Sequence, residues 1–147
     1  ENLAFLRDLT KLPILLKGVL HPDDARLALE HGADGLIVSN HGGRQVDGAI
    51  SSLEALPGVI DAVAGRVPVL LDSGVYGGAD AFKALALGAA AVCVGRPYAY
   101  GLALGGSAGV TAALSNLLAD FDLTMALAGC RRISEIGRDC LLDAGRP

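Results

Sequence analysis

The segment from Ser39 to Gln45, Ser-Asn-His-Gly-Gly-Arg-Gln, concentrates residue types that carry out chemistry. It directly follows the apolar run Gly35–Val38, which has the length and branching of a buried strand. His41 has an intrinsic pKa near neutrality and is a candidate general base. Arg44, three residues later, can bind a substrate carboxylate through two parallel hydrogen bonds. We interpret this segment as a catalytic loop.

Two glycine-containing loops are candidates for holding a phosphate group. Residues 72–78, Asp-Ser-Gly-Val-Tyr-Gly-Gly, lead into one predicted helix, and Gly95-Arg96-Pro97 lead into another. Glycine lets the backbone approach an anion, and a helix N-terminus presents N–H groups with a favourable dipole. Either loop alone is better explained as a tight turn. Because they follow the last two strands, where barrels often form a phosphate site, the pair favours phosphate binding.

Two further polar residues stand at the ends of apolar strands. Lys17 ends the run that begins at Leu12, and a lysine there either lies at the solvated rim or pairs with an anion, since burying it alone is costly. Ser39 either donates to a ligand or simply caps a turn. His21 and His31 lie at the two ends of a predicted helix and are interpreted as surface residues.

The elements that position these residues alternate between strand and helix. Strands are predicted over residues 12–18, 35–39, 67–72 and 91–94, and helices over residues 22–31, 51–64, 79–87 and 107–128. Pro57 is expected to delay or kink the second helix. The strands are nearly continuous apolar runs, which predicts an α/β fold with a parallel sheet covered on both faces. Four such units are half of a (β/α)8 barrel, and every reactive residue lies at a strand carboxyl end, the catalytic face.

Composition limits the classes of partner and compartment. The 147 residues carry a net charge of −4 with a pI near 5.2, which argues against nucleic acid as a partner. Three cysteines without metal-ligand spacing favour free thiols and a cytoplasmic location. The longest mostly apolar stretch, residues 84–94, is too short to span a bilayer. The absence of an initiator Met and a helix-like start predict truncation, and the open sheet edges of a half-barrel predict a homo-oligomer or pairing with another chain.

The sequence resembles the FMN-dependent enzymes that oxidise α-hydroxy acids, a family that includes glycolate oxidase, lactate oxidase, lactate 2-monooxygenase and flavocytochrome-type lactate dehydrogenases. The resemblance covers nearly the whole chain and matches the C-terminal half of the family's barrel. It is carried by residues 12–19 (Leu-Pro-Ile-Leu-Leu-Lys-Gly-Val), 39–47 (Ser-Asn-His-Gly-Gly-Arg-Gln-Val-Asp), 72–74 (Asp-Ser-Gly), 82–89 (Phe-Lys-Ala-Leu-Ala-Leu-Gly-Ala) and 95–97 (Gly-Arg-Pro). It implies one partial domain over residues 1–147, the last four β/α units of a TIM barrel followed by C-terminal helices.

The resemblance also implies roles for individual residues. His41 would take a proton from an L-2-hydroxy acid such as lactate or glycolate, and Arg44 would bind its carboxylate. The cofactor FMN would be reoxidised by O2 or another acceptor. Its isoalloxazine would contact Lys17 and Ser39, and its ribityl chain and phosphate would contact the residues Asp72, Ser73, Gly74, Val75, Tyr76, Gly95 and Arg96.

Two departures from the family pattern keep an alternative open. Tyr76 stands where the family usually has a phosphate-binding arginine. The family's first four strands, with their substrate-binding tyrosines and the aspartate that supports the imidazolium, have no counterpart in these residues. The alternative is a catalytically silent half-barrel that binds FMN or phosphate weakly, or only pairs with another chain. An unrelated phosphate-binding barrel would explain the glycine loops but not His41 with Arg44.

Overall fold

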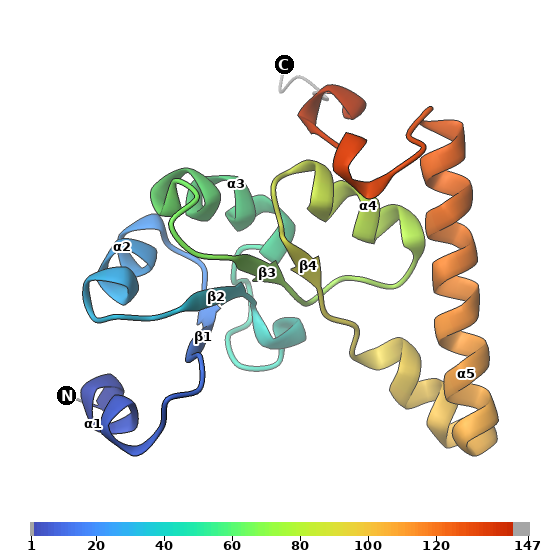
Figure 1. The fold of residues 1–147 in the computed structure, drawn as a ribbon. Helices are drawn as coiled ribbons and strands as arrows, with labels where there is room; N and C mark the ends of the chain where they lie inside the picture. The colour runs from blue at the N-terminus through green and yellow to red at the C-terminus, as the bar shows by residue number, and fades with distance from the viewer. Residues whose placement is uncertain (1, 143–147) are drawn as a thin grey trace. The chain divides into compact units, whose positions relative to one another are not determined.

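The structure is a computed structural model that describes residues 2–142 (Figure 1). Strands and helices alternate along the chain. The strands are β1 (Leu15–Val19), β2 (Gly35–Val38), β3 (Val69–Leu71) and β4 (Ala91–Val92), and the helices are α1 (Asn2–Leu9), α2 (Pro22–Glu30), α3 (Ser52–Val63), α4 (Gly78–Ala86) and α5 (Arg96–Leu127). Short 3-10 turns cover His41–Gly43, Ile133–Glu135 and Arg138–Cys140.

The four strands form one parallel sheet in the order β1-β2-β3-β4, as the sequence predicts. Helices α2 and α3 pack against each other and against the strands. The sheet face toward these helices is closed, because Leu36, Val38 and Leu71 are almost fully buried. Residues on the other face, such as Ile37 and Leu70, are only half-buried. Coverage is therefore complete on the face toward α2 and α3, and the partly exposed face is the one that half of a barrel leaves without its covering strands.

The first strand differs from its prediction at Gly18. The strand begins at Leu15 rather than Leu12, and it continues through Gly18 to Val19 instead of ending there. Its pairing with β2 shifts register between Lys17 and Val19, so Gly18 occupies a bulge with a φ of 98°. Only glycine adopts such a φ without strain, and bulges often reorient side chains beside functional sites.

Helix α3 continues through its proline without a break. The Ser51 hydroxyl accepts from the Glu54 N–H (3.2 Å) and donates to the Glu54 carboxylate (2.8 Å), which fixes the start of the helix. Pro57 lies inside the helix, and no residue within it departs from helical geometry. The expected delay or kink does not occur, because this cap and the burial of Leu56 and Val59 outweigh the hydrogen bond that proline cannot make.

The chain divides into two compact units. The first comprises Glu1–Gly74 and Ala89–Cys93 and contains the sheet with α1, α2 and α3. The second comprises Val75–Gly88 and Val94–Pro147 and contains α4, α5 and the two C-terminal 3-10 turns. Each unit is described by itself below.

In the second unit, α5 is broken at Gly105 and Gly106, where the backbone leaves helical geometry. The two arms, residues 96–104 and 107–127, approach so closely that a Cβ at Gly109 would lie 2.0 Å from the Gly101 carbonyl oxygen. The longer arm packs on α4 and on the C-terminal turns through Phe121 and Met125. On this arm Val110, Leu117, Phe121 and Met125 are at least partly buried, whereas Leu114 and Leu118 are exposed.

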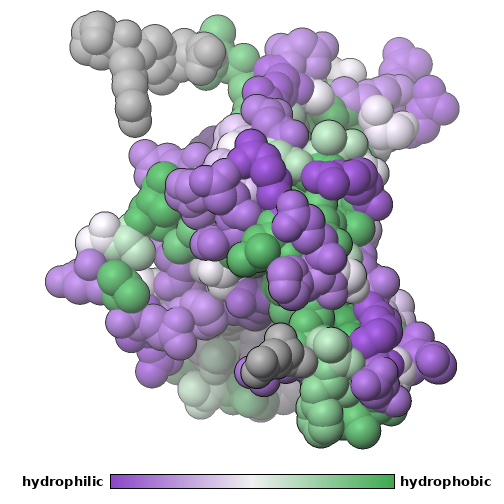
Figure 2. Space-filling model, turned by 90° about the vertical axis from the view of Figure 1, so that its left-hand side faces the viewer, coloured by the Kyte–Doolittle hydropathy of each residue, from purple (hydrophilic) through white to green (hydrophobic). Residues whose placement is uncertain are grey.

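Helix α5 is long and apolar enough by length and composition to cross a membrane, and it is the one such helix in residues 2–142. The sequence analysis weighed only residues 84–94, so the expected absence of a membrane segment stays a prediction. Apolar side chains also reach the surface elsewhere, for example Phe5 and Leu9 of α1. Figure 2 shows such apolar surface, in green, interspersed among polar residues on one face.

Candidate functional site

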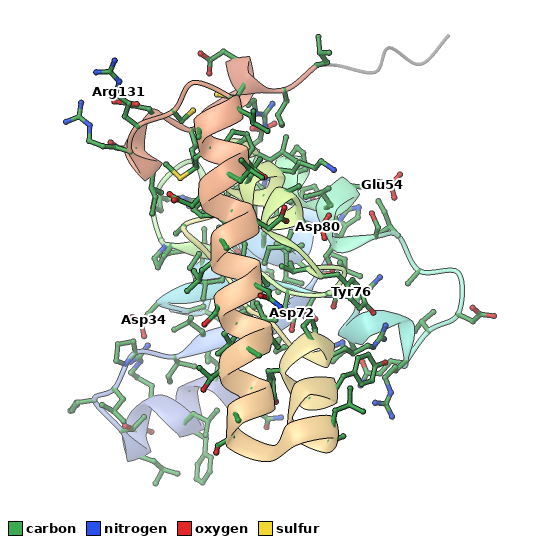
Figure 3. The ribbon with its side chains drawn as sticks, turned by 90° about the vertical axis from the view of Figure 1, so that its right-hand side faces the viewer. Asp34, Glu54, Asp72, Tyr76, Asp80 and Arg131 are labelled. Atoms are coloured by element: carbon green, nitrogen blue, oxygen red, sulfur yellow. The ribbon has the colours of Figure 1, made fainter. Side chains whose placement is uncertain are left out.

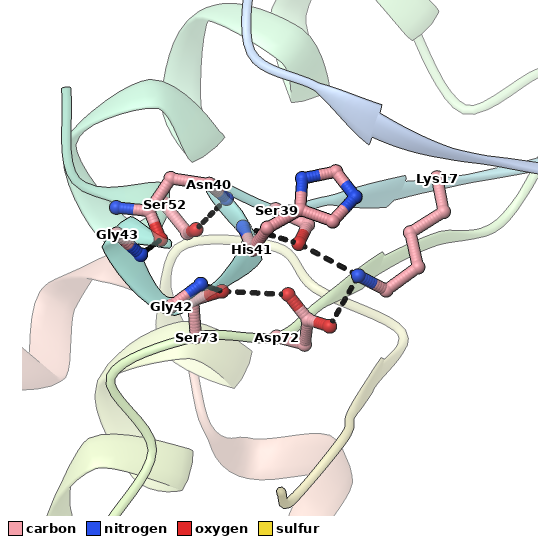
Figure 4. Close-up of polar contacts among 9 residues, drawn as sticks. All are labelled: Lys17, Ser39, Asn40, His41, Gly42, Gly43, Ser52, Asp72 and Ser73. Carbon is pink, nitrogen blue, oxygen red and sulfur yellow. Dashed lines mark hydrogen bonds and ion pairs between the residues drawn. The ribbon is translucent and has the colours of Figure 1, made fainter. Parts of the chain in front are cut away.

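A hydrogen-bonded network joins the carboxyl ends of β1, β2 and β3 (Figure 4). The Lys17 ammonium donates to the Ser39 hydroxyl (2.9 Å) and forms an ion pair with the Asp72 carboxylate (2.9 Å). The Ser73 hydroxyl donates to the other Asp72 oxygen at 2.8 Å. Ser39 is fully buried. The sequence placed these residues at corresponding strand ends, and the structure brings them into contact.

The strand register and the alternation of side chains along each strand explain why these residues meet. Lys17, Ile37 and Leu70 are neighbours across the sheet. Side chains two residues apart on a strand lie on the same face, so Ser39 and Asp72 follow Ile37 and Leu70 toward the carboxyl edge. The Lys17 side chain starts one level lower and is long enough to reach both. Lys17 therefore pairs with a carboxylate of the protein itself while its side chain stays 42% exposed, and its contact with the cofactor remains a prediction.

Asp72 is held as a carboxylate. Its partial burial opposes ionisation, but hydrogen bonds from Ser39, Lys17 and Ser73 and the charge of Lys17 outweigh that effect and lower its pKa below the ordinary value. The Lys17 ammonium and the Asp72 carboxylate consequently form a neutralised pair at physiological pH.

This shift predicts a pH dependence of stability. Because the pKa of Asp72 is lower in the folded state, its ionisation stabilises the fold at pH values above its pKa in the unfolded chain, about 3.9. That stabilisation is lost as the pH falls through the pKa of Asp72 in the folded chain. We expect the native chain to be more stable than an Asp72→Asn variant at neutral pH, and the difference to shrink below about pH 4. Urea unfolding of both proteins between neutral and acidic pH measures it. A difference that stays constant over this range would contradict the assignment.

His41 begins the 3-10 turn and lies against the β1 bulge. Its backbone has a φ of 56°, an uncommon conformation for a residue with a side chain, and its N–H donates to the buried Ser39 hydroxyl at 3.1 Å. A Cβ added at Gly18 would lie 2.8 Å from His41 Cε1. The glycine therefore makes room for the imidazole, which Figure 4 shows beside Ser39 and Lys17. A strained backbone at such a point is typical of functional sites.

A Gly18→Ala variant is expected to displace the His41 ring. Both Gly18 and Gly32 have left-handed φ values, 98° and 82°, but a Cβ at Gly32 meets nothing within 4 Å. Gly32→Ala is thus the matched control for backbone strain, which costs about 1–2 kcal/mol. Because a side chain can move away from a clash, the sharpest readout is the imidazole chemical shift of His41 in NMR spectra. Equal His41 shifts in the two variants would contradict the packing of His41 on Gly18.

Arg44 is exposed and follows the 3-10 turn directly. Three hydrogen bonds hold the turn in place. The Gly42 N–H donates to Ser73 Oγ (2.9 Å), and the Gly43 N–H donates to Asn40 Oδ1 (3.2 Å). The Asn40 N–H donates to Ser52 Oγ (3.0 Å). Within residues 2–142, no hydrogen bond or ion pair joins Arg44 to the network. The structure thus holds His41, the predicted base, against the network and leaves Arg44, the predicted clamp, at the surface.

In the second unit, Tyr76 and Arg96 contact each other. The Arg96 guanidinium donates to the Tyr76 phenol oxygen at 2.7 Å, and this hydrogen bond raises the pKa of Arg96, which stays cationic. Gly95 caps the N-terminus of α5. Tyr76 thus occupies a position next to the predicted phosphate-binding arginine and holds it through a neutral hydroxyl.

The N-terminus of α4 is already occupied by carboxylates. Asp80 accepts from the N–H groups of Tyr76 (3.0 Å) and Gly77 (3.1 Å), and Asp120 accepts from the N–H groups of Gly78 (2.5 Å) and Ala79 (3.2 Å). Figure 3 shows Tyr76 and Asp80 at this end of the helix. The open N–H groups expected at residues 76–79 are therefore bonded within the unit, and the N-terminus of α5 is the remaining candidate for a phosphate.

Other predicted contact residues have more limited roles. Ser73 joins Asp72 to the catalytic loop through its hydroxyl, and its own φ is 72°. Gly74 also has a positive φ, 80°, and the Val75 side chain is buried, so Val75 can offer a ligand only its backbone. Ser73 therefore supports the loop that carries His41, a role the sequence analysis did not predict.

Sequence reasoning missed two residues near these sites. Asp120 lies 42 residues after Gly78, so the residues next to Gly78 in the sequence do not indicate that Asp120 caps α4. Cys93 follows β4 in the first unit, where burial and the nearby Asp72 carboxylate raise the pKa of its thiol. The placement of Cys93 at a strand carboxyl end was the signal that could have associated it with the network.

Comparisons with known proteins identify the family. Residues 1–143 match the family described as FMN-dependent dehydrogenase. The chain is 57% identical over 133 residues to an L-lactate oxidase of Lysinibacillus sphaericus, covering 90% of this chain and 34% of the relative. It is 54% identical over 138 residues to the glycolate oxidase of Spinacia oleracea, covering 94% and 37%.

Solved structures agree with the sequence relatives. A crystal structure of mandelate oxidase superposes with a TM-score of 0.88 at 46% identity, covering 92% of this chain and 40% of that one. The fold is therefore part of a (β/α)8 barrel. The chain spans about a third of the length of the two curated relatives named above. The match over residues 1–143 and these identities show that the chain belongs to the FMN-dependent dehydrogenase family.

Proposed function

We propose that this chain contributes to the FMN-dependent oxidation of a small L-2-hydroxy acid, similar to lactate or glycolate, to the 2-oxo acid. The observation that carries the proposal is the network of Lys17, Ser39 and Asp72 at the strand ends. His41 lies next to this network, with its ring packed against Gly18. A base next to a cationic donor at the carboxyl edge of a parallel sheet suits the removal of a proton as charge passes to an acceptor.

The donors of the network fit a flavin. Lys17 Nζ has three protons, and Ser39 and Asp72 use two of them, so one remains for a ligand. The Lys17 side chain is 42% exposed, which makes the ammonium accessible. A fixed cation is suited to stabilise negative charge on a reduced ring system. We therefore assign Lys17 to the isoalloxazine. Ser39, predicted to contact the same ring, is fully buried, and its hydroxyl holds the Lys17 ammonium in place.

The catalytic roles of His41 and Arg44 are part of the same proposal. FMN, when bound, supplies the acceptor of two electrons. His41 accepts the substrate proton at its imidazole, which lies against Gly18, while the Ser39 hydroxyl holds the backbone N–H of His41. Arg44, on the same loop, binds the substrate carboxylate through its guanidinium and so orients the α-carbon toward His41. Asp72 pairs with the Lys17 ammonium at the edge of the sheet. His41 is then not needed as a partner for Lys17 and can hold the substrate proton.

Phosphate binding is assigned to Gly95 and Arg96 in the second unit. Arg96 supplies the positive charge, and Gly95 supplies a backbone position without a side chain at the start of α5. Gly74, Val75 and Tyr76 are assigned to the neighbouring ribityl chain. Because Tyr76 adds a neutral hydroxyl where the family usually has a second cation, we expect phosphate affinity to be lower than in the relatives.

A silent binding module is the second candidate. It is favoured by the exposed apolar side chains, among them Leu15 on β1 and Leu114 and Leu118 on α5, and by the half-buried face of the sheet. These surfaces suit pairing with further protein, either a second copy or another chain. On this reading FMN binds weakly and no substrate is oxidised.

One experiment separates the two candidates. The purified chain is mixed with FMN, freed of unbound flavin and given L-lactate or glycolate without oxygen. Bleaching of the bound flavin absorbance, reversed when O2 is admitted, supports the oxidoreductase and identifies O2 as an acceptor. Bound flavin that does not bleach supports the silent module. A chain that retains no flavin contradicts the oxidoreductase proposal for this chain.

A further inference from the structure

Two cysteine side chains lie side by side at the C-terminal end of the second unit. The sulfur atoms of Cys130 and Cys140 are 3.7 Å apart, although ten positions separate the residues in the chain. A disulfide needs a sulfur–sulfur distance of about 2.05 Å, so closure requires a movement of only roughly 1.7 Å. Neither residue contributes to the proposed flavin or substrate contacts.

The backbone between them is arranged as a tight loop that brings the thiols together. Both sulfurs lie near the Glu135 carbonyl oxygen, at 3.8 Å for Cys130 and 3.9 Å for Cys140. The Glu135 carboxylate accepts from the Arg131 N–H (2.7 Å) and from Arg132 Nε (3.1 Å), which fixes the first half of the loop. The 3-10 turn Arg138–Cys140 fixes the second half. The pair is thus held in place before any bond forms.

The loop also closes a small apolar core. Phe82 of α4, Met125 of α5 and Cys130 form a buried cluster, and Ile136, Cys140 and Leu141 pack against it. A covalent link at this point would join the end of α5 to the C-terminal turns that cover α4. Its effect would therefore be to hold the turns on this core.

We propose that Cys130 and Cys140 are a reversible thiol–disulfide site. The oxidant is a small-molecule disulfide such as oxidised glutathione. The Cys140 thiolate attacks one sulfur of that disulfide, forms a mixed disulfide and releases one glutathione thiolate, which takes up a proton. The Cys130 thiolate then attacks Cys140 Sγ and releases the second glutathione. Two protein thiols and one disulfide thus become one protein disulfide and two thiols, with no other electron acceptor.

The order of the two attacks follows from exposure. Cys140 is partly exposed, whereas Cys130 is buried with 7% of its surface accessible. Burial and the neighbouring thiol raise the pKa of Cys130, which makes its thiol the less reactive of the two toward an external disulfide. Cys140 therefore meets the oxidant, and Cys130 resolves the product.

The test uses the full chain with Cys93 replaced by serine, because Cys93 is the third cysteine and is not in the pair. The folded protein is incubated with oxidised glutathione, its remaining thiols are alkylated, and it is digested with trypsin without reduction. Cleavage after Arg131, Arg132 and Arg138 separates the two cysteines, so a disulfide leaves their peptides linked. We expect linked peptides, loss of both alkylation sites together and full recovery after reduction.

Single replacements provide the controls. In Cys130→Ser the mixed disulfide on Cys140 is expected to persist, since the resolving thiol is gone. In Cys140→Ser the buried Cys130 is expected to stay reduced and alkylatable after unfolding. Three results would overturn the proposal: both thiols remaining alkylatable in the Cys93→Ser protein, glutathione retained on both cysteines, or a link that joins two chains. None of these readouts depends on flavin, so failure here leaves the proposed function untouched.

Discussion

A His41→Ala variant is expected to retain bound FMN and to lose about a hundredfold or more in the rate at which a 2-hydroxy acid reduces it. General base catalysis contributes about 10²–10⁴-fold to such reactions. His41 is fixed by its contact with Gly18 and by the Ser39 hydroxyl, and it makes no hydrogen bond to the Lys17–Asp72 pair that would be lost with its ring. Removing the imidazole should therefore affect proton transfer and spare the flavin contacts. Anaerobic stopped-flow absorbance measures the rate.

The chain provides a matched control in His31. This histidine caps the C-terminal end of α2, is exposed, and has its Nδ1 3.0 Å from the Leu27 carbonyl oxygen of its own helix. A His31→Ala variant should reduce flavin at the rate of the unaltered chain. If His41→Ala and His31→Ala reduce flavin equally fast, His41 is not the base.

Gly78→Ala is expected to destabilise the second unit by about 3 kcal/mol or more. A Cβ at Gly78 would lie 1.9 Å from the backbone nitrogen of Phe121 and 2.4 Å from the carbonyl carbon of Asp120. Backbone atoms cannot rotate away as a side chain can, so α4 and α5 would have to separate. Separation would also break the bonds that Asp120 accepts from Gly78 and Ala79. The gain in helix propensity from glycine to alanine, about 1 kcal/mol, is smaller than this loss.

Gly105→Ala serves as the control for this prediction. Gly105 lies at the break in α5, its φ of −149° is open to alanine, and a Cβ there meets nothing within 4 Å. Urea unfolding followed by far-ultraviolet circular dichroism compares the two variants, and hydrogen exchange of α4 and α5 shows which helices loosen. A Gly78→Ala protein as stable as Gly105→Ala would show that the two helices do not pack this closely.

The sheet and the convergence of its polar ends were predictable from the sequence. Apolar runs of strand length, each followed by a polar residue, predict parallel strands whose ends meet, and Lys17, Ser39 and Asp72 do meet. An anionic partner for Lys17 was one of two alternatives, and the sequence did not identify Asp72 as that partner. Choosing between them requires the strand register, which places Lys17 beside Ile37 and so within reach of Asp72.

Some local predictions were wrong because they depend on contacts between residues that lie far apart in the sequence. Gly18 looks like a strand terminator, but the bulge it forms depends on pairing with β2. Pro57 looks like a helix breaker, but burial of Leu56 and Val59 keeps the helix intact. The N-terminus of α4 looks open to an anion, but Asp120 arrives from α5 to occupy it. Each is a tertiary contact that overrides a local preference.

Family membership was predictable because residues 39–45 combine a candidate base, His41, with a candidate binder of a carboxylate, Arg44, and two glycines. The roles of individual residues remain proposals. Arg44 lies on an exposed loop, and loop side chains take their final position only against a ligand. Tyr76 shows the converse: its departure from the family was visible in the sequence, but its hydrogen bond with Arg96 needed the structure.

The most direct test of the central claim, that the strand ends of the first unit hold the flavin through Lys17, is a titration of the chain with FMN. Quenching of flavin fluorescence gives the Kd for the unaltered chain, for Lys17→Met and for Lys11→Met, whose lysine is exposed and outside the network. Losing one charge-assisted contact should raise the Kd of Lys17→Met about tenfold or more, and Lys11→Met should match the unaltered chain. Equal Kd values for the two variants, or no quenching with any of the three proteins, would contradict the claim.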